Sequence, residues 1–470
     1  MQIDNSHIDL LEKEMAWHYR IIPFDKQENT LFLYSDQPEN FDTISEEVEA
    51  LTGFFIQMEI IPNEEIEQLL AIHYRKSKND FIQNTSSQKP SATKGETHLI
   101  EKIIFDAIAV GSSDIHLEIY KDEARVRIRI DGLMVEKSKL DKEEYYEIVN
   151  RIKIQSNLDI TEKRLPQDGR THLNGFDIRV SILPTLHGEK IVMRILGQDA
   201  TNIDIHKLGL HEKEKYHYLE ATKKKHGIIL ISGPTGSGKT TTLYATLKIL
   251  NEIKRNIVTV EDPIEYTLDG INQVQLKENI GLTFTSVLRS FLRQDPDVIM
   301  LGEIRDSETA EMAIRASLTG HLVLSTIHTN SAWGTITRLT DMGIPPFLLS
   351  ETLNISVAQR LVRKLCPHCK KEEKIEIQSL PFKYQDKIIE ESHFVAKGCS
   401  KCHFTGYQGR TAIYEIIPID PELSKLIKEE VPQIDEVLKR KEIVKLSDKA
   451  FDLFQKGETS LEEIYAILIQ

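Results

Sequence analysis

The spacing of hydrophobic and polar residues changes along the chain, and each spacing predicts a different element. Residues 124–132 alternate strictly, which predicts a strand with one buried face and one cationic face. The run at 228–231 is short, apolar and branched, as in a buried strand, and 241–250 carries apolar residues at helical spacing. A strand that leads directly into a helix is typical of an α/β fold.

The same patterns divide the chain into three domains and a linker, which is about the number that 470 residues suggest. Residues 1–75 alternate short strands with helices and predict a short α/β N-terminal domain. Residues 76–97 are polar, as in a flexible linker, so the first domain is expected to move and to act as a docking domain. Residues 98–200 predict a smaller α+β domain, and 201–470 hold the largest domain.

Composition and charge narrow the class of protein. The chain is 40% hydrophobic and 28% charged, as in an ordinary globular protein, and its net charge of −14 argues against direct binding of nucleic acid. The first residues lack the pattern of a signal peptide, and no apolar run approaches the length of a membrane span. We therefore expect a cytoplasmic protein whose membrane contact is made through partners.

One octet matches the phosphate-binding loop of nucleotide-binding proteins at every position. It lies between the predicted strand and helix, as the motif requires, which disfavours a simple glycine-rich turn. Its glycines let backbone N–H groups face a phosphate at a helix N-terminus, its lysine reaches the β- and γ-phosphates, and Thr240 can ligate Mg²⁺. The loop residues are Gly233, Pro234, Thr235, Gly236, Ser237, Gly238, Lys239 and Thr240, followed by Thr241.

Acidic residues follow two further predicted strands. Glu261, Asp262 and Glu265 come after the strand at 256–260, where metal and water are expected in such sheets. Glu303 ends a buried strand that begins at Asp297. This segment resembles the second signature of P-loop ATPases, except that Gly302 stands where an aspartate commonly holds Mg²⁺ through water. These carboxylates are candidates to hold a metal or to activate water; the alternatives are a strand-end salt bridge for Glu303 and a turn for Asp262.

A further buried strand is predicted at 321–330, with a histidine at each end. Thr326, His328, Thr329 and Asn330 could sense a γ-phosphate by hydrogen bonding. The alternative is a histidine that only satisfies core contacts.

The four cysteines form two Cys-x-x-Cys pairs: Cys366 and Cys369, then Cys399 and Cys402. Four thiolates complete the tetrahedral shell of a structural Zn²⁺ and leave no position open for catalysis. A redox dithiol is the alternative for either pair alone, but two pairs with no cysteine left over favour zinc. His368 and His403 lie beside the cysteines and are expected to be bystanders.

Taken together, these motifs resemble the secretion ATPase superfamily, with its Walker A motif, aspartate box, atypical Walker B motif and histidine box in order. The four cysteines and the sequence Gln359-Arg360-Leu361 resemble two branches: the type II secretion ATPases (general secretion pathway protein E) and the type IV pilus assembly ATPases. The resemblance covers 98–470. Residues 1–75 match a shortened form of the family's docking domain only loosely.

The resemblance implies a homohexamer of RecA-like domains, each with an inserted zinc element at 366–402 and a preceding smaller, PAS-like domain. ATP would bind between these two domains, with Arg179 and Arg194 as the arginine fingers that stabilise charge on the γ-phosphate. Without the resemblance, either arginine would be assigned to a surface salt bridge.

The hypothesis that follows is an ATP hydrolase peripheral to the inner membrane. Glu303, helped by Glu265 or Glu261, would activate water, and His328 would sense the γ-phosphate. Docking and platform proteins would turn hydrolysis into assembly of a type II secretion pseudopilus. The alternatives are type IV pilus assembly, a nucleic-acid-translocating ATPase, or a nucleotide-gated module without turnover. A retraction motor is disfavoured because that branch generally lacks the four cysteines.

Overall fold

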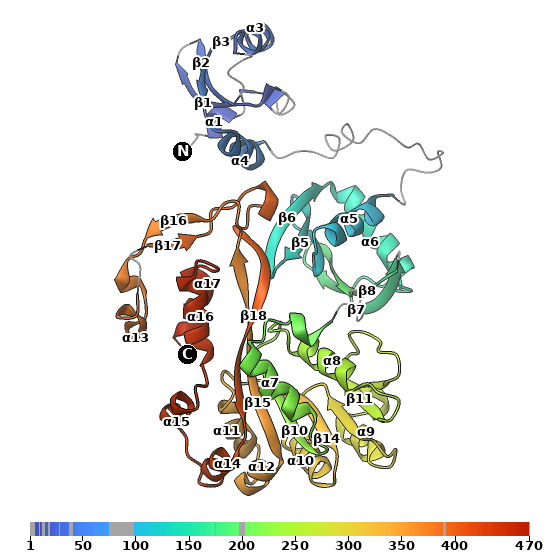
Figure 1. The fold of residues 1–470 in the computed structure, drawn as a ribbon. Helices are drawn as coiled ribbons and strands as arrows, with labels where there is room; N and C mark the ends of the chain where they lie inside the picture. Colours follow the sequence, from blue (N-terminus) through green and yellow to red (C-terminus); the bar gives the residue numbers. More distant parts are fainter. Residues whose placement is uncertain are drawn as a thin grey trace.

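The computed structural model shows three sheet-containing units in chain order (Figure 1). It describes residues 5–8, 10–11, 15–16, 19–27, 29–36, 41–74, 98–173, 175–196, 203–388 and 392–469. The linker predicted at 76–97 lies outside these residues. The predicted domain limits stay predictions, although each unit has its own sheet within them.

The first unit is a three-stranded sheet of order β1-β2-β3, in which β1 is antiparallel to β2 and β2 is parallel to β3. Buried Ile21, Leu31, Val48, Ile66 and Leu70 form the centre of its core. Its elements are α1 (Asn5–Ile8), β1 (Ile21–Gln27), β2 (Thr30–Ser35), α3 (Phe41–Thr52), β3 (Phe55–Ile60) and α4 (Asn63–His73).

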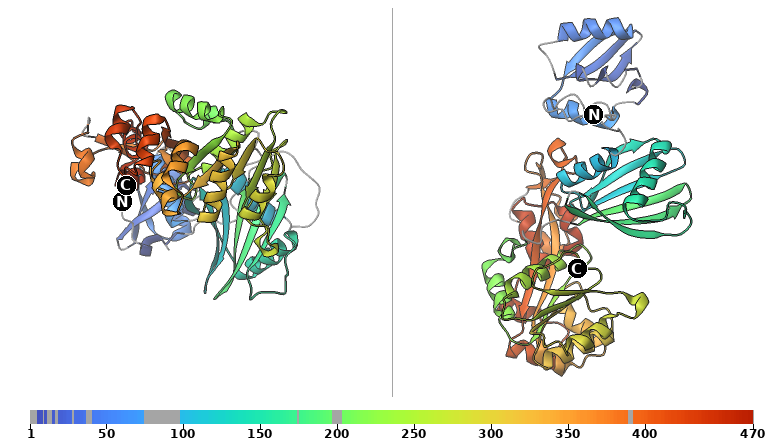
Figure 2. Two further views of the ribbon diagram at one scale, coloured as in Figure 1. Left: turned by 90° about the horizontal axis from the view of Figure 1, so that it is seen from below. Right: turned by 90° about the vertical axis from the view of Figure 1, so that its right-hand side faces the viewer.

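The second unit is a six-stranded antiparallel sheet of order β6-β5-β4-β9-β8-β7, with two helices on one face (Figure 2). Ile115 and Leu117 of β4 pack toward the helices, so the alternate residues Asp114, His116 and Glu118 lie on the other face. The α+β prediction for this unit is confirmed, and its PAS-like assignment stays a prediction. Its elements are α5 (His98–Ala109), β4 (Asp114–Ile119), β5 (Ala124–Ile130), β6 (Leu133–Leu140), α6 (Lys142–Gln155), β7 (Gln167–Leu173), β8 (Phe176–Thr185) and β9 (Gly188–Leu196).

The third unit is built on a seven-stranded sheet of order β12-β11-β13-β14-β10-β15-β18, parallel except for β18. Every residue of β10, β11, β13 and β14 is buried, because helices cover both faces. The strands are β10 (Gly227–Ser232), β11 (Ile257–Glu261), β12 (Asn272–Gln275), β13 (Val298–Leu301), β14 (Leu322–Ile327), β15 (Leu353–Leu365) and β18 (Tyr407–Pro418).

Alternate residues of β10 divide the helices of this unit between two cores. Ile229 and Ile231 pack with α7 (Glu212–Thr222) and α8 (Lys239–Leu250), whereas Ile228 and Leu230 face the core on the other side of the sheet. That second core also holds residues from α9 (Phe284–Phe291), α10 (Ser307–Leu318), α11 (Gly334–Asp341), α12 (Pro346–Thr352), α14 (Pro421–Lys428), α15 (Asp435–Arg440), α16 (Leu446–Gln455) and α17 (Leu461–Leu468).

The cysteine-containing insertion connects β15 to β18, two strands that pair with each other. It contains the two-stranded sheet β16–β17, and its last turn is the short helix η7. Its elements are β16 (Lys371–Lys374), α13 (Phe382–Gln385), β17 (Ser392–Val395) and η7 (Ser400–Cys402).

The structure corrects one sequence prediction and adds detail to another. The strand predicted at 321–330 is shorter: β14 leaves out both histidines, and His321 instead bonds through Nδ1 to the carbonyl oxygen of Ala316, 2.9 Å away. The cationic face of β5 is present but not free, because Glu118 and Asp114 of the paired strand β4 neutralise its arginines.

Candidate functional site

The predicted phosphate loop connects the inner strand β10 to helix α8. Gly236 and Gly238 have φ angles of 79° and 86°, in the left-handed region that favours glycine. A Cβ atom on Gly233 would lie 2.5 Å from the carbonyl oxygen of Gln359, and one on Gly238 would lie 2.8 Å from the Nε2 atom of the same residue. The loop therefore depends on glycine for its conformation and for its close approach to β15.

Lys239, the first residue of α8, points back along the loop. Its Nζ atom donates to the carbonyl oxygens of Gly233, at 2.8 Å, and Pro234, at 3.0 Å. Burial lowers the pKa of Lys239, and the nearby charge of Glu303 opposes this shift. In the same loop, the buried hydroxyl of Ser237 has no hydrogen-bond partner among the described residues. A spare donor beside a buried cation at a helix N-terminus fits a bound phosphate.

The rest of the predicted loop is open to solvent. Pro234, Thr235, Gly236 and Thr240 are exposed, and Thr241 is half-buried. The exposed Thr240 directly follows Lys239, so its hydroxyl suits the expected Mg²⁺, a cation that takes oxygen ligands.

Glu303 follows β13, and its carboxylate lies between the side chains of Arg305 and His328. Its Oε1 atom is 2.5 Å from Nη2 of Arg305, and its Oε2 atom is 3.4 Å from Nε2 of His328. The carboxylate is 19% exposed, so it is oriented by these partners but still reachable by water. Strands β10, β13 and β14 thus bring Lys239, Glu303 and His328 into one group at the carboxyl edge of the sheet, where ligands bind in such folds.

The other predicted members of the histidine segment bond to protein groups. Thr326 donates to the carbonyl oxygen of Gly302 at 2.8 Å, Thr329 donates to that of Ser331 at 2.9 Å, and Asn330 Oδ1 accepts from Arg360 at 3.4 Å. Sensing of a γ-phosphate by this segment stays a prediction, which the geometry narrows to His328.

Glu261 is enclosed by protein donors. It is 4% exposed. Its Oε1 atom accepts from Thr259 Oγ1 at 2.6 Å and from Gln273 Nε2 at 3.1 Å, and its Oε2 atom accepts from the Tyr244 hydroxyl of α8. This carboxylate ties β11 to α8 and has little capacity left for water.

Asp262 and Glu265, by contrast, face arginines. Asp262 lies 3.8 Å from Nη1 of Arg305, and Glu265 Oε2 lies 3.9 Å from Nη2 of Arg179. Each carboxylate therefore lies beside an arginine, Arg305 or Arg179, whose guanidinium could also bind a phosphate.

Arg179 and Arg194 line a cleft of about 470 Å³ between the second and third units, together with Asp114, Arg170 and Pro263. Arg179 Nη2 donates to the carbonyl oxygen of Ile264 at 2.6 Å, and burial lowers the pKa of this guanidinium. Arg194 Nε donates to Asp114 at 2.9 Å within its own domain. The structure thus brings both predicted arginines beside the segment that carries Glu265.

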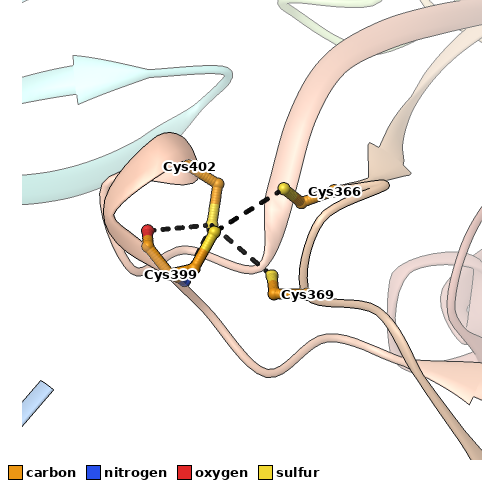
Figure 3. A group of neighbouring side chains, drawn as sticks. All are labelled: Cys366, Cys369, Cys399 and Cys402. Carbon is orange, nitrogen blue, oxygen red and sulfur yellow. Dashed lines mark hydrogen bonds between the residues drawn. The ribbon is translucent and has the colours of Figure 1, made fainter. Parts of the chain in front are cut away.

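The four cysteines form one cluster, with all Sγ atoms within 4.8 Å of one another (Figure 3). The Sγ atoms of Cys366 and Cys399 are 4.0 Å apart, and those of Cys369–Cys402 and of Cys399–Cys402 are 3.8 Å apart. A tetrahedral zinc ion with Zn–S bonds of about 2.3 Å requires S–S distances of about 3.8 Å. The donor set therefore fits zinc, and the cluster contains no histidine.

The sequence motifs indicated no functional role for three residues of the site: Tyr244, Arg305 and Gln359. Arg305 follows Glu303 by two positions within the same motif, and Gln359 and Arg360 interrupt the apolar part of β15. Polar residues inside a buried strand are the signal that could have drawn attention to Gln359. Tyr244 gave no such signal, because its partner Glu261 lies on another element.

Comparison with protein families identifies two regions. Residues 92–466 match the family described as type II/IV secretion system protein, and residues 1–80 match the MshEN domain.

Named relatives fall in two groups. The type IV pilus assembly ATPase PilB of Myxococcus xanthus is 42% identical over 89% of this chain and 79% of its own length. The type II secretion system ATPase E of Vibrio cholerae is 46% identical over 78% of this chain and 74% of its own length. The solved structure of the pilus retraction motor PilT with bound ADP aligns with a TM-score of 0.55 and 28% identity, over 78% of this chain and 96% of that one.

Proposed function

This chain belongs to the type II/IV secretion system protein family, and we propose that it is an ATPase that powers assembly of a protein filament at a membrane. The observation that carries the proposal is the grouping of Lys239, Glu303 and His328 at the ends of neighbouring strands. In this group a lysine suited to binding phosphate lies beside an oriented carboxylate, and these two kinds of group support the proposal of phosphoanhydride hydrolysis.

Each residue of the group has a distinct role. Lys239 and the loop amides hold the β- and γ-phosphates of ATP, and Thr240 supplies a hydroxyl ligand for Mg²⁺, which neutralises phosphate charge when bound. Glu303 orients or deprotonates the attacking water, because its carboxylate is held by Arg305 and His328 and is still 19% exposed, so water can reach it. His328 reports whether a γ-phosphate is present.

The interdomain cleft supplies the remaining charges. Arg179 and Arg194 stabilise charge on the γ-phosphate when the two domains close over ATP. Glu265 lies 3.9 Å from Arg179 and assists Glu303. Glu261 is assigned to positioning, because its oxygens are already occupied by Tyr244, Thr259 and Gln273.

The cysteine cluster holds a structural Zn²⁺ in this proposal. Four thiolates fill its coordination shell, so the ion fixes the connection between β15 and β18 and takes no part in hydrolysis.

The chain acts as a homohexamer whose N-terminal domain docks on proteins of the inner membrane. Among the described residues, no helix combines the length and the hydrophobicity that a membrane crossing needs. We assign the ring to the cytoplasmic face of the membrane, with its membrane contact made by docking and platform proteins.

Two filaments are candidates. Export through a type II secretion pseudopilus is favoured by the higher identity to the ATPase E of Vibrio cholerae, and assembly of a type IV pilus is favoured by the longer match to PilB of Myxococcus xanthus. The phenotype of a deletion strain separates them: loss of secreted proteins from the medium indicates secretion, and loss of surface pili indicates pilus assembly.

The biochemical test is phosphate release by the purified full chain. Wild-type protein should hydrolyse ATP without added DNA, and Lys239→Ala should abolish both nucleotide binding and turnover. Binding without phosphate release would instead show a nucleotide-gated module, and turnover that depends on DNA would show a translocase.

A further inference from the structure

Gln359 lies beside the phosphate loop on the strand next to β10. Strand β15 pairs with β10 as far as Ser232 and Ala358, so Gln359 comes level with the first residue of the loop. Its side chain is 2% exposed. A buried glutamine usually forms hydrogen bonds through its carboxamide, because an unpaired polar group in the interior costs free energy.

The carboxamide of Gln359 is held in one orientation. Its Oε1 atom accepts a hydrogen bond from Thr242 Oγ1, at 2.9 Å, on the first turn of α8. The Nε2 group is therefore directed at Gly238, where a Cβ atom would lie 2.8 Å away, and the main-chain oxygen faces Gly233, where a Cβ atom would lie 2.5 Å away. Gln359 thus meets both ends of the loop.

The same residue is tied to the histidine segment. Arg360 Nη1 donates to the carbonyl oxygen of Gln359 at 3.0 Å, and its Nη2 donates to that of Asn330, also at 3.0 Å. Asn330 comes two residues after His328. One buried guanidinium therefore connects the oxygen that touches Gly233 with the segment proposed to sense the γ-phosphate.

From these contacts, and resting on the proposed function, we propose that Gln359 is a positioning residue that sets the phosphate loop for ATP. The Thr242 bond fixes the carboxamide, the carboxamide and carbonyl of Gln359 fix the two ends of the loop, and Arg360 links that position to His328. A loop held in its binding conformation loses less entropy when ATP binds. Loss of the carboxamide should therefore weaken binding of ATP more than it slows the chemical step.

Two variants test this in the full chain. Gln359→Glu keeps the shape and the acceptor for Thr242 but replaces the Nε2 donor with a negative oxygen beside the loop. Thr242→Val keeps the shape of Thr242 and removes the hydroxyl that orients the carboxamide. Thr246→Val is the matched control: Thr246 is buried one turn further along α8, and its hydroxyl bonds to Tyr218 and to the carbonyl oxygen of Thr242 rather than to Gln359.

We expect both test variants to raise the KM for ATP and the dissociation constant of an ATP labelled on the ribose with a methylanthraniloyl group. The change should be about tenfold at most, the worth of one hydrogen bond between neutral groups, with a smaller effect on kcat. Thr242→Ser, which restores the hydroxyl, should bring KM back toward the wild-type value, and Thr246→Val should leave KM and affinity unchanged.

Wild-type affinity in Thr242→Val overturns the proposal, and so does a loss of affinity in Thr246→Val equal to that in Thr242→Val. Thr242→Val carries the test if Gln359→Glu does not fold. A wild-type chain that neither binds nor hydrolyses ATP would refute the proposed function itself, which is a distinct result.

Discussion

Arg179 and Ile264 join the second and third units of the chain: Nη2 of Arg179 on β8 lies 2.6 Å from the carbonyl oxygen of Ile264, which follows β11. The Nε–H group of the same side chain is buried without a hydrogen-bond partner among the described residues. Arg179 therefore reaches the nucleotide-binding domain with a donor to spare, whereas Arg194 is bound to Asp114 in its own domain.

Arg179→Ala should consequently lower kcat for ATP hydrolysis on the order of 10³-fold, the lower end of the effect of arginine fingers. Arg164→Ala is the control, since Arg164 belongs to the same domain, is 88% exposed and pairs with the nearby Glu162. The measurement is steady-state phosphate release by the assembled oligomer. Equal turnover of the two variants would contradict the role given to Arg179.

Substitution of Glu303 should affect turnover, whereas substitution of Glu261 should affect stability. Glu303→Gln should lower kcat by about 10²-fold or more, as loss of a general base does, while binding of ATP is retained. Glu261→Gln should lower the free energy of unfolding by about 1–3 kcal/mol, because an amide hydrogen would then face the donors that now bond to Glu261.

Phosphate release and thermal unfolding of both variants, measured on the same preparations, separate the two roles. Glu308→Gln serves as the control, because Glu308 is 62% exposed and pairs with Arg289 away from the loop. A Glu303→Gln protein with wild-type turnover would transfer the role of base to Glu265.

The phosphate loop and the cysteine cluster could be predicted because each is specified by residues close together in sequence. Glycines at fixed positions between a strand and a helix determine the loop, and two Cys-x-x-Cys turns each bring two thiols together. The network around Glu261 could not be predicted, since Tyr244 and Gln273 meet it only after α8 and β12 have packed around β11. Arg179 and Arg194 needed the family resemblance, because their place depends on how two domains dock.

The prediction for β5 was likewise incomplete because it depends on a contact between segments that are distant in sequence. Alternation predicted its buried and cationic faces, but the charge of the second face depends on the partner strand. Antiparallel register sets Arg129 opposite Asp114 and Arg125 opposite Glu118, so acids that are distant in sequence neutralise the arginines.

Chelation should test the zinc assignment. We expect about one zinc ion per chain by inductively coupled plasma mass spectrometry, and a lower melting temperature after prolonged treatment with EDTA, since a structural zinc site contributes to folding. Cys366→Ser should lose the metal. His368→Ala should keep it, because His368 is exposed beside the cluster and is not part of it. A purified chain that holds no zinc and melts unchanged with EDTA would exclude the assignment.

Glu118 should make the second unit sensitive to acid. Its Oε1 atom lies 2.6 Å from Arg127 Nη2 and 3.1 Å from Lys190 Nζ, and its Oε2 atom accepts from Arg125 Nε at 3.0 Å. Burial alone would raise the pKa of Glu118, but the hydrogen bonds from Arg127, Lys190 and Arg125 outweigh it and lower the pKa from 4.5 to about 2.

The sign of the pH dependence follows from this lowered pKa. As the pH falls from about 5 toward about 2, the unfolded chain binds a proton at Glu118 before the folded chain does, so the stabilisation from Glu118 is lost. That contribution is fully present above about pH 5 and amounts to at most about 3 kcal/mol. Glu118→Gln removes the titration and leaves three cations around a neutral amide, so it should be less stable than wild type at neutral pH.

Urea titrations of the full chain at several pH values between about 3 and 7 measure the effect. The gap between the midpoints of wild type and Glu118→Gln should stay constant between about pH 7 and pH 5 and narrow as the pH falls further. Glu123→Gln, which alters a partly exposed carboxylate paired with Lys139 on the same sheet, is the control and should follow wild type. A constant gap between wild type and Glu118→Gln across this range would show that Glu118 is not held ionised by its three cations, because only a lowered pKa makes the gap depend on pH in this direction.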